Sequence, residues 1–247
     1  MSILRSAAVT FGNAIPPRWK RALKWRLMIP DAGASLELIR QKGFSPKVVL
    51  DIGGFVGAWT RMCREVWPQA AVCMFEPQPD KRAVLESLVR SMPGVTLRSE
   101  LLGREAGQEV EFHLAESGSS SLSLLAKPHS PSIRLVTQTL SRAVAGTVFA
   151  KPDLIKVDVQ GAELDVLDGG PEVLAAAEVV MLEVALVEEY AGGPLFADVV
   201  SYMAQRGFLV HDICTIFRNT ASQSMNEADV IFVRCGSPLN DKKFYLG

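Results

Sequence analysis

Short runs of apolar, mostly β-branched residues alternate along the chain with longer segments in which apolar positions recur at helical spacing. From residue 47 onward most of these runs are followed by a helical segment, and glycine or proline often marks the boundary. This alternation predicts an α/β fold, with a mostly parallel sheet and helices on both faces. The predicted strands are residues 48–52, 72–75, 95–101, 109–115, 153–159, 179–185, 208–214 and 228–234.

The predicted helices lie at residues 58–67, 80–92, 162–167 and 195–206. Asp80 follows Pro79 and is expected to be the N-cap of the second helix, while Gly207 ends the last one. The final two strands are joined by a polar connection, residues 218–226, and should pair antiparallel.

One long segment fits neither pattern. Residues 116–132 (ESGSSSLSLLAKPHSPS) are rich in serine, contain two prolines and show no clear period. A long polar loop inside a compact domain is usually functional or mobile. We therefore expect this serine-rich segment to border the binding site and to help select the substrate.

The composition argues against several classes of protein. Charged residues make up 21% of the chain and the net charge is −1, so there is no overall attraction to nucleic acid or to an anionic membrane. No basic and aromatic pattern indicates RNA or DNA binding. We expect no signal peptide, because the first residues lack a continuous apolar segment, and no apolar run is long enough to span a bilayer. The cysteines form no CxxC pair, which predicts reduced core thiols in a cytoplasmic protein; they are Cys63, Cys73, Cys214 and Cys235.

The start of the chain differs in charge from the rest. No acidic residue precedes Asp31, whereas six lysines and arginines do. We therefore expect an N-terminal basic helical segment, residues 1–46, followed by the main domain, residues 47–247. The basic segment can pack on the domain with its charges in water. A lid, a docking surface and a weak membrane contact are the alternatives.

Acidic residues stand at or just after the ends of four predicted strands: Asp51, Glu76, Asp158 and Glu183. In open parallel sheets, ligands bind outside the carboxyl ends of the strands, near the point where the strand order reverses. These residues are therefore the first candidates for the binding site, and Asp158 and Glu183, which end adjacent strands, are expected to face the same cleft.

The segment from Asp51 to Gly57 (DIGGFVG) is a glycine-rich turn between a strand and a helix. Its glycines lack the G-x-G-x-x-G spacing of a dinucleotide site, and Asp51 would repel a phosphate there. Glu76, at the end of the next strand, can accept hydrogen bonds from both hydroxyls of a ribose. Together these features favour a nucleoside cofactor that is positively charged and lacks phosphate, such as S-adenosylmethionine (SAM).

Three stretches of the chain resemble known motifs. Residues 48–59 (VVLDIGGFVGAW) and 72–81 (VCMFEPQPDK) resemble the first two motifs of class I SAM-dependent methyltransferases. Residues 153–170 (DLIKVDVQGAELDVLDGG) resemble the signature of the FkbM family. The resemblance covers residues 47–212. It implies a Rossmann-like fold whose seven-stranded, mostly parallel sheet has an antiparallel C-terminal strand. It also implies methyl transfer from SAM to a hydroxyl of a sugar or secondary metabolite.

The resemblance assigns the glycine-rich turn to the cofactor. Asp51, Gly53 and Gly57 match the first motif and would line the methionine part of SAM, with Gly54 beside them. Phe55 stands where the family often has asparagine. We expect its ring to pack over the cofactor or to form an apolar wall of the pocket.

Other positions match as well. Glu76 matches the ribose-binding acid, and Pro77 follows it as in the family's FEP motif. Ser99 and Leu101 lie in the segment SELLG, which usually borders the adenine. The signature commonly has glutamate where this chain has Gln160. The matching signature positions are Lys156, Asp158, Gly161 and Glu163.

Methyl transfer to a hydroxyl needs alignment of the acceptor and removal of its proton. Asp158 and Glu183 are candidates for this work, and Asp158 can also bind the ammonium of the cofactor. Two carboxylates can also hold a divalent metal ion, although their spacing does not establish one. His129, in the serine-rich segment, is a candidate base, with an exposed loop histidine as the alternative.

Two further functions stay open from the residues. One is a methyltransferase-like binding or scaffold protein without turnover. The other is a nicotinamide-dependent oxidoreductase, against which the glycine spacing argues. The expected partner is a small-molecule hydroxyl acceptor rather than nucleic acid, and an oligomer is possible.

Overall fold

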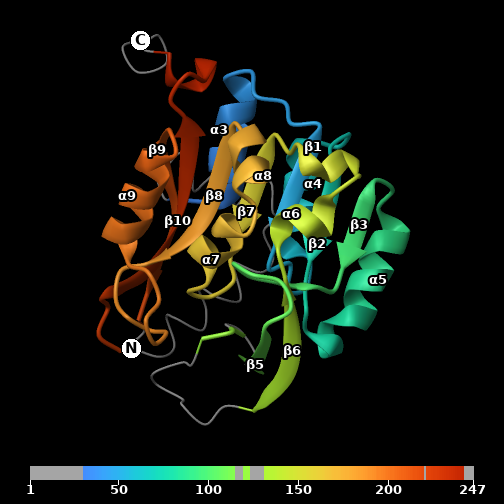
Figure 1. Ribbon diagram of the computed structural model, residues 1–247. Helices are drawn as coiled ribbons and strands as arrows, with labels where there is room; N and C mark the ends of the chain where they lie inside the picture. Colours follow the sequence, from blue (N-terminus) through green and yellow to red (C-terminus); the bar gives the residue numbers. More distant parts are fainter. Residues whose placement is uncertain (1–29, 115–118, 123–130, 220, 242–247) are drawn as a thin grey trace, which may run out of the picture.

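A seven-stranded sheet forms the centre of the molecule (Figure 1). The computed structural model describes residues 30–114, 119–122, 131–219 and 221–241. The strand order is β3-β2-β1-β7-β8-β10-β9, and β10 alone runs antiparallel to its neighbours. This confirms the predicted fold class. The strands, in sheet order, are Val95–Arg98, Ala71–Phe75, Val48–Ile52, Leu154–Val157, Val179–Ala185, Met225–Arg234 and Phe208–Arg218.

Helices cover both faces of this sheet. One face carries α3 (Ala32–Gln41), α4 (Ala58–Val66) and α5 (Arg82–Ser91), the last of which follows a 3₁₀ turn. The other face carries four helices: α6 (Leu140–Val144), α7 (Glu163–Asp168), α8 (Pro171–Ala176) and α9 (Phe196–Gln205). The short 3₁₀ helices are Pro79–Lys81, Val148–Ala150 and Pro238–Asn240.

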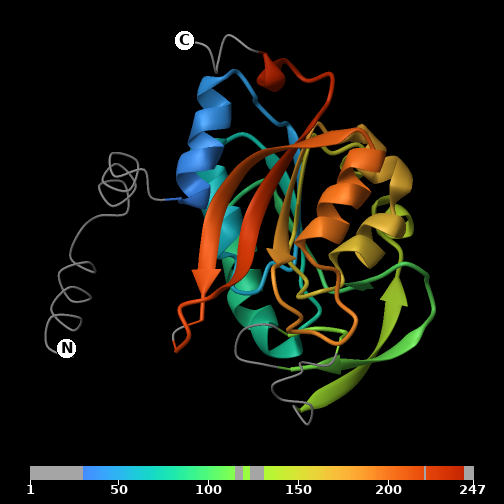
Figure 2. The ribbon, with the colours of Figure 1, turned by 90° about the vertical axis from the view of Figure 1, so that its left-hand side faces the viewer.

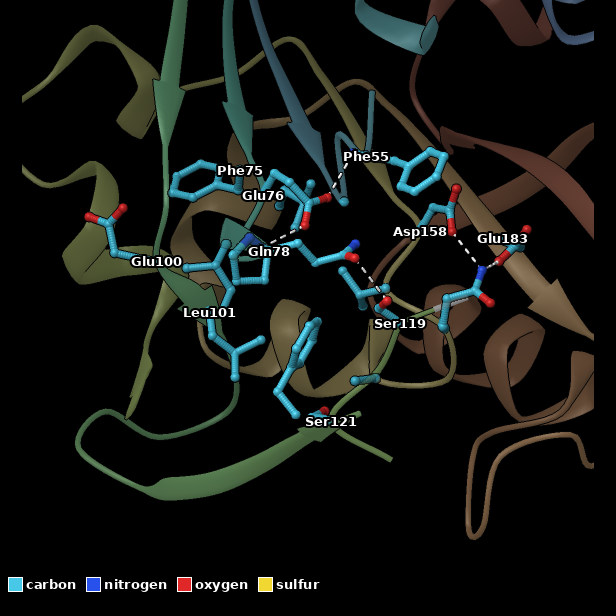
Figure 3. A pocket seen from close by; sticks show the side chains of 18 residues that line it. Phe55, Phe75, Glu76, Gln78, Glu100, Leu101, Ser119, Ser121, Asp158 and Glu183 are labelled. Carbon is cyan, nitrogen blue, oxygen red and sulfur yellow. Dashed lines mark hydrogen bonds between the residues drawn. The ribbon is translucent and has the colours of Figure 1, made fainter. Parts of the chain in front are cut away.

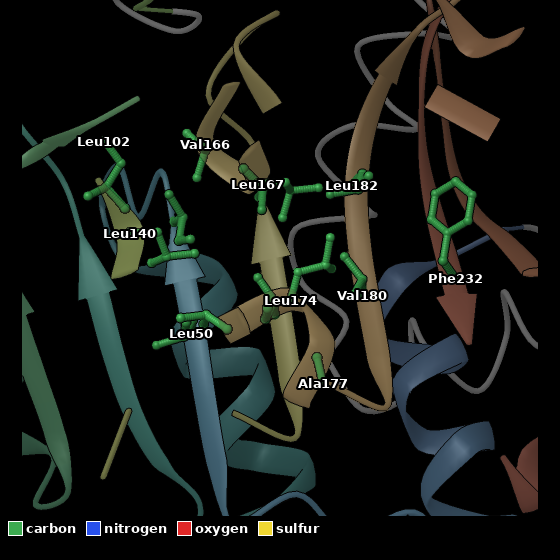
Figure 4. Packing of buried hydrophobic residues seen from close by; sticks show 14 of the residues in the cluster. Leu50, Leu102, Leu140, Val166, Leu167, Leu174, Ala177, Val180, Leu182 and Phe232 are labelled. Atoms are coloured by element: carbon green, nitrogen blue, oxygen red, sulfur yellow. The ribbon is translucent and has the colours of Figure 1, made fainter. Parts of the chain in front are cut away.

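The alternation of side chains along each strand divides the core into two layers. Val49 of β1 packs with α3 and α4, whereas the next residue, Leu50, packs with the layer that contains Leu140 of α6 and Leu174 of α8 (Figure 4). Successive side chains of a strand point to opposite faces of the sheet. Because both faces are covered by helices, nearly every residue of a core strand is apolar.

The strand order reverses beside β1. The chain builds β1, β2 and β3 outward in one direction and then returns to place β7 on the other side of β1. The carboxyl ends of β1 and β7 therefore flank the point at which ligands bind in open α/β sheets.

A second, three-stranded sheet was only partly predicted. It has the order β4-β6-β5, formed by Leu101–Leu102, Ser132–Gln138 and Glu109–His113. The predicted strand 95–101 is wrong in its second half, because the chain leaves the main sheet after Arg98 and starts β4 in the small one. Strand β6 was missed: none of its side chains is fully buried, so it lacks the apolar run that marks the core strands.

Two local predictions were wrong. Asp80 is not an N-cap: it lies inside the 3₁₀ turn before α5 and pairs with Lys81 at 2.8 Å. Cys235 is exposed after β10, while the other three cysteines are buried as expected. All four are free thiols.

The first 29 residues lie outside the described part of the chain. Helix α3, within the predicted segment 1–46, packs Leu36 and Ile39 into the core layer of the main sheet. The division at residue 46 stays a prediction. No helix within the described ranges has the length and apolar character needed to cross a membrane.

Arg234, at the end of β10, ties α8 to the sheet. Its guanidinium donates to the carbonyls of Leu174, Ala175 and Ala177 at 2.8–3.0 Å and lies 4.4 Å from the Phe208 ring. These carbonyls belong to the last turn of the helix and its cap, where backbone donors within the helix run out, although the carbonyl of Leu174 also accepts from the N–H of Ala177 at 3.2 Å.

We predict that Arg234→Met lowers the free energy of unfolding by about 2 kcal/mol, because charged hydrogen bonds and a cation–π contact are lost together. Urea denaturation measures the change. Arg142→Met, on the exposed surface of α6, is the matched control and should leave stability within about 0.5 kcal/mol of the wild type. Equal effects of the two substitutions would contradict the capping role.

Candidate functional site

A cavity opens at the carboxyl ends of β1, β2 and β7 (Figure 3). The turn after β1, the segment after β2 and the segment after β7 form its inner walls. The small sheet and the described part of the serine-rich segment close the outer side. The residues that line it are Ile52, Gly53, Phe55, Phe75, Glu76, Pro77, Gln78, Glu100, Leu101, Leu102, Phe112, Ser119, Ser121, Asp158, Val159, Gln160, Ala162 and Glu183.

The glycines of the turn after β1 are required mainly by close packing against other parts of the protein, rather than by a ligand. A Cβ at Gly53 would lie 1.8 Å from the carbonyl oxygen of Asp158, and one at Gly54 would lie 2.3 Å from Cγ of Met74. At Gly57 the obstacle is a leucine of α5, 2.6 Å away. Gly53 lines the cavity, whereas Gly54 and Gly57 are absent from its lining. The turn is thus packed tightly against the neighbouring strands and α5.

Phe55 adopts a backbone conformation that is unusual for a bulky residue. Its φ is +48°, in the left-handed region that asparagine and glycine enter more readily. Its N–H donates to Oε2 of Glu76 at 2.7 Å, and its ring lies on the cavity, 4.8 Å from Nζ of Lys81. The strained conformation therefore directs a backbone donor at the Glu76 carboxylate.

Glu76 is held from two sides. Oε2 accepts from the N–H of Phe55, and Oε1 accepts from the N–H of Gln78 at 2.9 Å. Only 5% of the residue is exposed, and burial raises its pKa although both backbone donors favour the charged form. Each oxygen keeps a lone pair for a ligand. The carboxylate is therefore fixed in position before any ligand binds.

A buried ion pair network lies beneath the turn. Nζ of Lys156 is 3.0 Å from the carbonyl of Gly53, 3.2 Å from Oδ2 of Asp158 and 3.5 Å from Oδ1 of Asp51. Burial opposes the charge on Lys156, but the carboxylates of Asp158 and Asp51 raise its pKa above the usual value. Asp51 is fully buried, accepts from Thr60 at 2.5 Å and does not line the cavity.

Asp158 and Glu183 meet at the cavity through one amide (Figure 3). Nε2 of Gln160 donates to Oδ1 of Asp158 at 2.9 Å and to Oε2 of Glu183, while its Oε1 accepts from the hydroxyl of Tyr190. Burial opposes ionisation of Asp158, but the Lys156 ammonium lowers its pKa overall. Burial and the Asp158 charge raise the pKa of Glu183 well above its ordinary value. Such a pair combines an ionised carboxylate with a proton-holding one.

The lining of the cavity is acidic. Four carboxylates border it, from Glu76, Glu100, Asp158 and Glu183, and no lysine, arginine or histidine is among its described lining residues. The ammonium of Lys156 lies behind the wall and is already engaged. The site therefore favours a cation and disfavours a phosphate.

A family model for the methyltransferase FkbM domain matches residues 51–210. The chain belongs to the FkbM methyltransferase family. The match starts at Asp51, near the end of β1, ends in β9 and contains every residue that lines the cavity. The resemblance noted in the sequence is confirmed.

Two curated relatives are similar over part of the chain. A hexuronic acid methyltransferase, AglP, of Haloferax volcanii is 24% identical over 149 residues, which cover 60% of each chain. A protein named methyltransferase 1 from Beauveria bassiana is 30% identical over 145 residues, or 49% of this chain and 57% of that one. The matches thus span less than two thirds of the length of either relative.

Solved structures with a similar arrangement include a precorrin-6y C5,15-methyltransferase from Geobacter metallireducens. It is 13% identical, with a TM-score of 0.45 over 81% of this chain and 86% of that one.

The structure brings most of the residues predicted for this FkbM site to the cavity. Gly53, Phe55, Glu76, Pro77, Leu101, Asp158 and Glu183 line it. Ser99 is exposed and lies outside the lining, because the chain turns away between β3 and β4. His129 lies outside the described residues.

Several neighbours of the site were missed. Gln78 and Gln160 each lie two residues after a predicted site acid, Glu76 and Asp158. This spacing is the feature of the sequence that could have placed both glutamines at the site. Tyr190 follows β8 in an irregular segment, and nothing in the sequence connects it to Gln160, 30 positions earlier. Among the described residues, no group of three or more histidine, cysteine, aspartate or glutamate side chains is arranged to hold a metal ion.

We predict that Gly53→Ala lowers the free energy of unfolding by about 3 kcal/mol or more, because a left-handed alanine is strained and its methyl group meets the carbonyl of Asp158. Gly146→Ala is the matched control: φ is +72° there, but the added Cβ meets nothing within 4 Å. The control should cost about 1 kcal/mol, from backbone strain alone. Equal losses in urea unfolding would show that packing against β7 is unimportant.

Glu163 makes stability depend on pH. It is 4% exposed, and burial raises its pKa to about 7 although the N–H groups of Val159 and Gly161 donate to it. The folded pKa lies above the unfolded value of about 4.3, so the folded state holds the proton more tightly. This contribution is complete below about pH 4 and is lost as pH rises through 7.

We predict that Glu163→Gln weakens the decline in stability between about pH 5 and pH 8, by up to about 3 kcal/mol at the upper end, because the amide has no proton to lose. Urea unfolding at a series of pH values tests this. Glu105→Gln, at an exposed position, should keep the wild-type profile. A Glu163→Gln profile identical to the wild type would contradict the buried titration.

Proposed function

We propose that this protein is a SAM-dependent O-methyltransferase that acts on a hydroxyl of a small molecule, a sugar or a secondary metabolite. The observation that carries the proposal is the acidic cavity, with Glu76 at one side and the Asp158–Glu183 pair at the other. The family membership supports methyl transfer. The relative named as a hexuronic acid methyltransferase supports a sugar acceptor.

The residues of the cavity fit SAM. Glu76 presents two oxygens to the hydroxyls of a ribose, and both are already oriented by backbone donors. Phe75 and Leu101 supply apolar surface beside it, suited to an adenine. The acidic lining, in which Asp158 is held ionised, attracts the positive charge of SAM and disfavours the pyrophosphate of a nicotinamide dinucleotide. When bound, SAM would supply the methyl group on its sulfonium.

The Asp158–Glu183 pair suits a hydroxyl acceptor. Its two carboxylates can orient the hydroxyl by accepting its hydrogen bond. A general base works best when its pKa is close to the working pH, and the raised pKa of Glu183 moves it in that direction. Lys156 keeps Asp158 ionised. The negative charge of Asp158 can therefore stabilise the proton that Glu183 takes from the acceptor. Gln160 holds both carboxylates in place.

The same electrostatics restrict the acceptor. A phosphate on the acceptor would approach an acidic lining in which Asp158 is held ionised. We therefore assign a hydroxyl compound without a phosphate group as the substrate class. The role of His129 as an alternative base stays a prediction.

We predict that Glu76→Gln weakens SAM binding by roughly 10- to 100-fold, because a ribose hydroxyl loses a charged acceptor. Glu183→Gln should leave SAM affinity within roughly threefold and lower the methyl-transfer rate by roughly 100-fold or more. Calorimetry with SAM and a labelled-methyl assay over neutral sugars and phenols measure the two effects.

The exposed Glu105→Gln is the control for both assays and should match the wild type. Calorimetry with NAD separates the cofactor classes. The proposal fails if NAD binds and SAM does not, or if Glu183→Gln methylates acceptors at the wild-type rate. Tight SAM binding without turnover on any acceptor would favour a binding protein instead.

A further inference from the structure

Exposed apolar side chains are concentrated on strand β9. Five of the nine large hydrophobic residues that are exposed within the described ranges lie on it: Leu209, Val210, Ile213, Ile216 and Phe217, with exposed fractions of 36–48%. The remaining four lie apart from one another: Val84 on α5, Val136 on β6, Val148 in a 3₁₀ helix and Val187 in the segment after β8. We call these five residues the apolar strip of β9. Exposed apolar side chains gathered on one element usually mark an interaction surface.

Strand β9 is also the edge of the main sheet. Among the described strands it pairs with β10 alone, and α3 and α9 flank it on the two faces of the sheet (Figure 2). Edge strands are normally protected by lysine, proline or inward charges. Between Leu209 and Phe217 the chain has no lysine, arginine, glutamate or proline, and Asp212 accepts from Ser35 of α3 at 2.5 Å. The edge thus carries no lysine or proline against strand pairing, and the irregularities in its pairing with β10 are the protective feature that it has.

The apolar residues are arranged symmetrically along the strand. Leu209 and Phe217 both lie four positions from Ile213, and Val210 and Ile216 both lie three positions from it. If two copies of β9 paired antiparallel about Ile213, each exposed apolar residue would face another one. Ile213 would face itself, Leu209 would face Phe217, and Val210 would face Ile216.

In this antiparallel register about Ile213, the residues that face each other also point to the same face of the sheet. Val210, Ile213 and Ile216 lie opposite Phe232, Val230 and Ala228 of β10, all in the core layer that contains α9. Residues directly opposite in a ladder point to the same face, so these three side chains share the α9 face.

Leu209 and Phe217 lie on the opposite face. Leu209 is opposite Val233, in the layer of α3, and Phe217 is opposite Glu227, which alternation places on that same face. Between Leu209 and Phe217 the pairing with β10 is irregular at Asp229/Val230 and at Ile231/Phe232. Each irregularity shifts the alternation of side chains along β9, which places Leu209 and Phe217 on the face opposite to Ile213. Each symmetric pair would therefore meet on one face.

We propose that β9 is a homodimer interface, at which two copies of this chain join their main sheets antiparallel about a two-fold axis at Ile213. A two-fold interface requires a self-complementary surface, and the symmetric apolar pattern supplies it. The charges agree with this register: Asp212 faces Cys214 of the second copy and His211 faces Thr215, so no charge faces a like charge. The interface is independent of the proposed methyl transfer.

Sedimentation of the full-length chain over a dilution series tests the interface. The wild type should have twice the chain mass of 26.9 kDa, and Ile213→Lys should be monomeric, because it places two like charges on the axis. Val136→Lys is the control: Val136 is 62% exposed on β6, away from β9, and this variant should stay dimeric. Circular dichroism confirms that each variant is folded.

The register has its own test. Leu209→Lys alone and Phe217→Glu alone should both weaken the dimer, and the double variant should restore it, because opposite charges then face each other at both ends of the interface. A dimer that forms through another surface or register would show no such rescue.

Disulfide trapping locates the axis. In a Cys235→Ser background, which removes the exposed native thiol, Ile213→Cys should cross-link under copper phenanthroline, because opposite residues in an antiparallel pair are within disulfide range. Val210→Cys alone should not cross-link, whereas a mixture with Ile216→Cys chains should. Val136→Cys is the negative control.

A monomeric wild type across the dilution series overturns the proposal. A dimer that survives Ile213→Lys overturns it as well. If removal of residues 1–29 converts a monomer into a dimer, the strip is covered by its own chain, and the proposal is also wrong. Vesicle binding by a monomeric wild type would assign the strip to a membrane surface and reject the dimer.

Discussion

A single buried ammonium group joins the two strands between which the cavity opens. Lys156, on β7, contacts Asp51 of β1, the carbonyl of Gly53 in the following turn and Asp158 at its own strand end. The side chain is 6% exposed, so its partners replace solvent almost completely. Removal of one member of such a buried network leaves an uncompensated charge, at a cost of about 3–5 kcal/mol. The positions of both strand ends therefore depend on this cation.

The charge states of the site follow from the same group. Because Lys156 keeps Asp158 ionised, the neighbouring Glu183 experiences a fixed negative charge, and its pKa rises. Gln160 occupies a position at which the family commonly has glutamate, and its uncharged amide suits the space between the two acids. Its amide donates to both carboxylates and its oxygen accepts from Tyr190, whereas a third carboxylate would add repulsion. This difference from the family is therefore compatible with an intact acid pair.

Backbone strain is concentrated around the cavity. Among the described residues, three other than glycine have positive φ, and two of them, Phe55 and Gln160, line the cavity. Each conformation directs a group at an acid: the N–H of Phe55 at Glu76, and the amide of Gln160 at Asp158 and Glu183. Strain of this kind costs about 1–3 kcal/mol per residue and persists where the surrounding packing enforces it. The tight contacts at Gly53 and Gly54 supply that packing.

Local patterns in the sequence determined the core strands, the parallel sheet, the glycine-rich turn and the acids at the strand ends, because strand period and turn chemistry depend on neighbouring residues. Tertiary structure decided what each of these residues contacts. Gly54 and Gly57 face Met74 and Leu88 rather than the cavity, and Asp51 faces Lys156. The pairing of Gln160 with Tyr190 and the exposed symmetry of β9 arise only after the chain has placed distant segments side by side. No local period encodes such contacts.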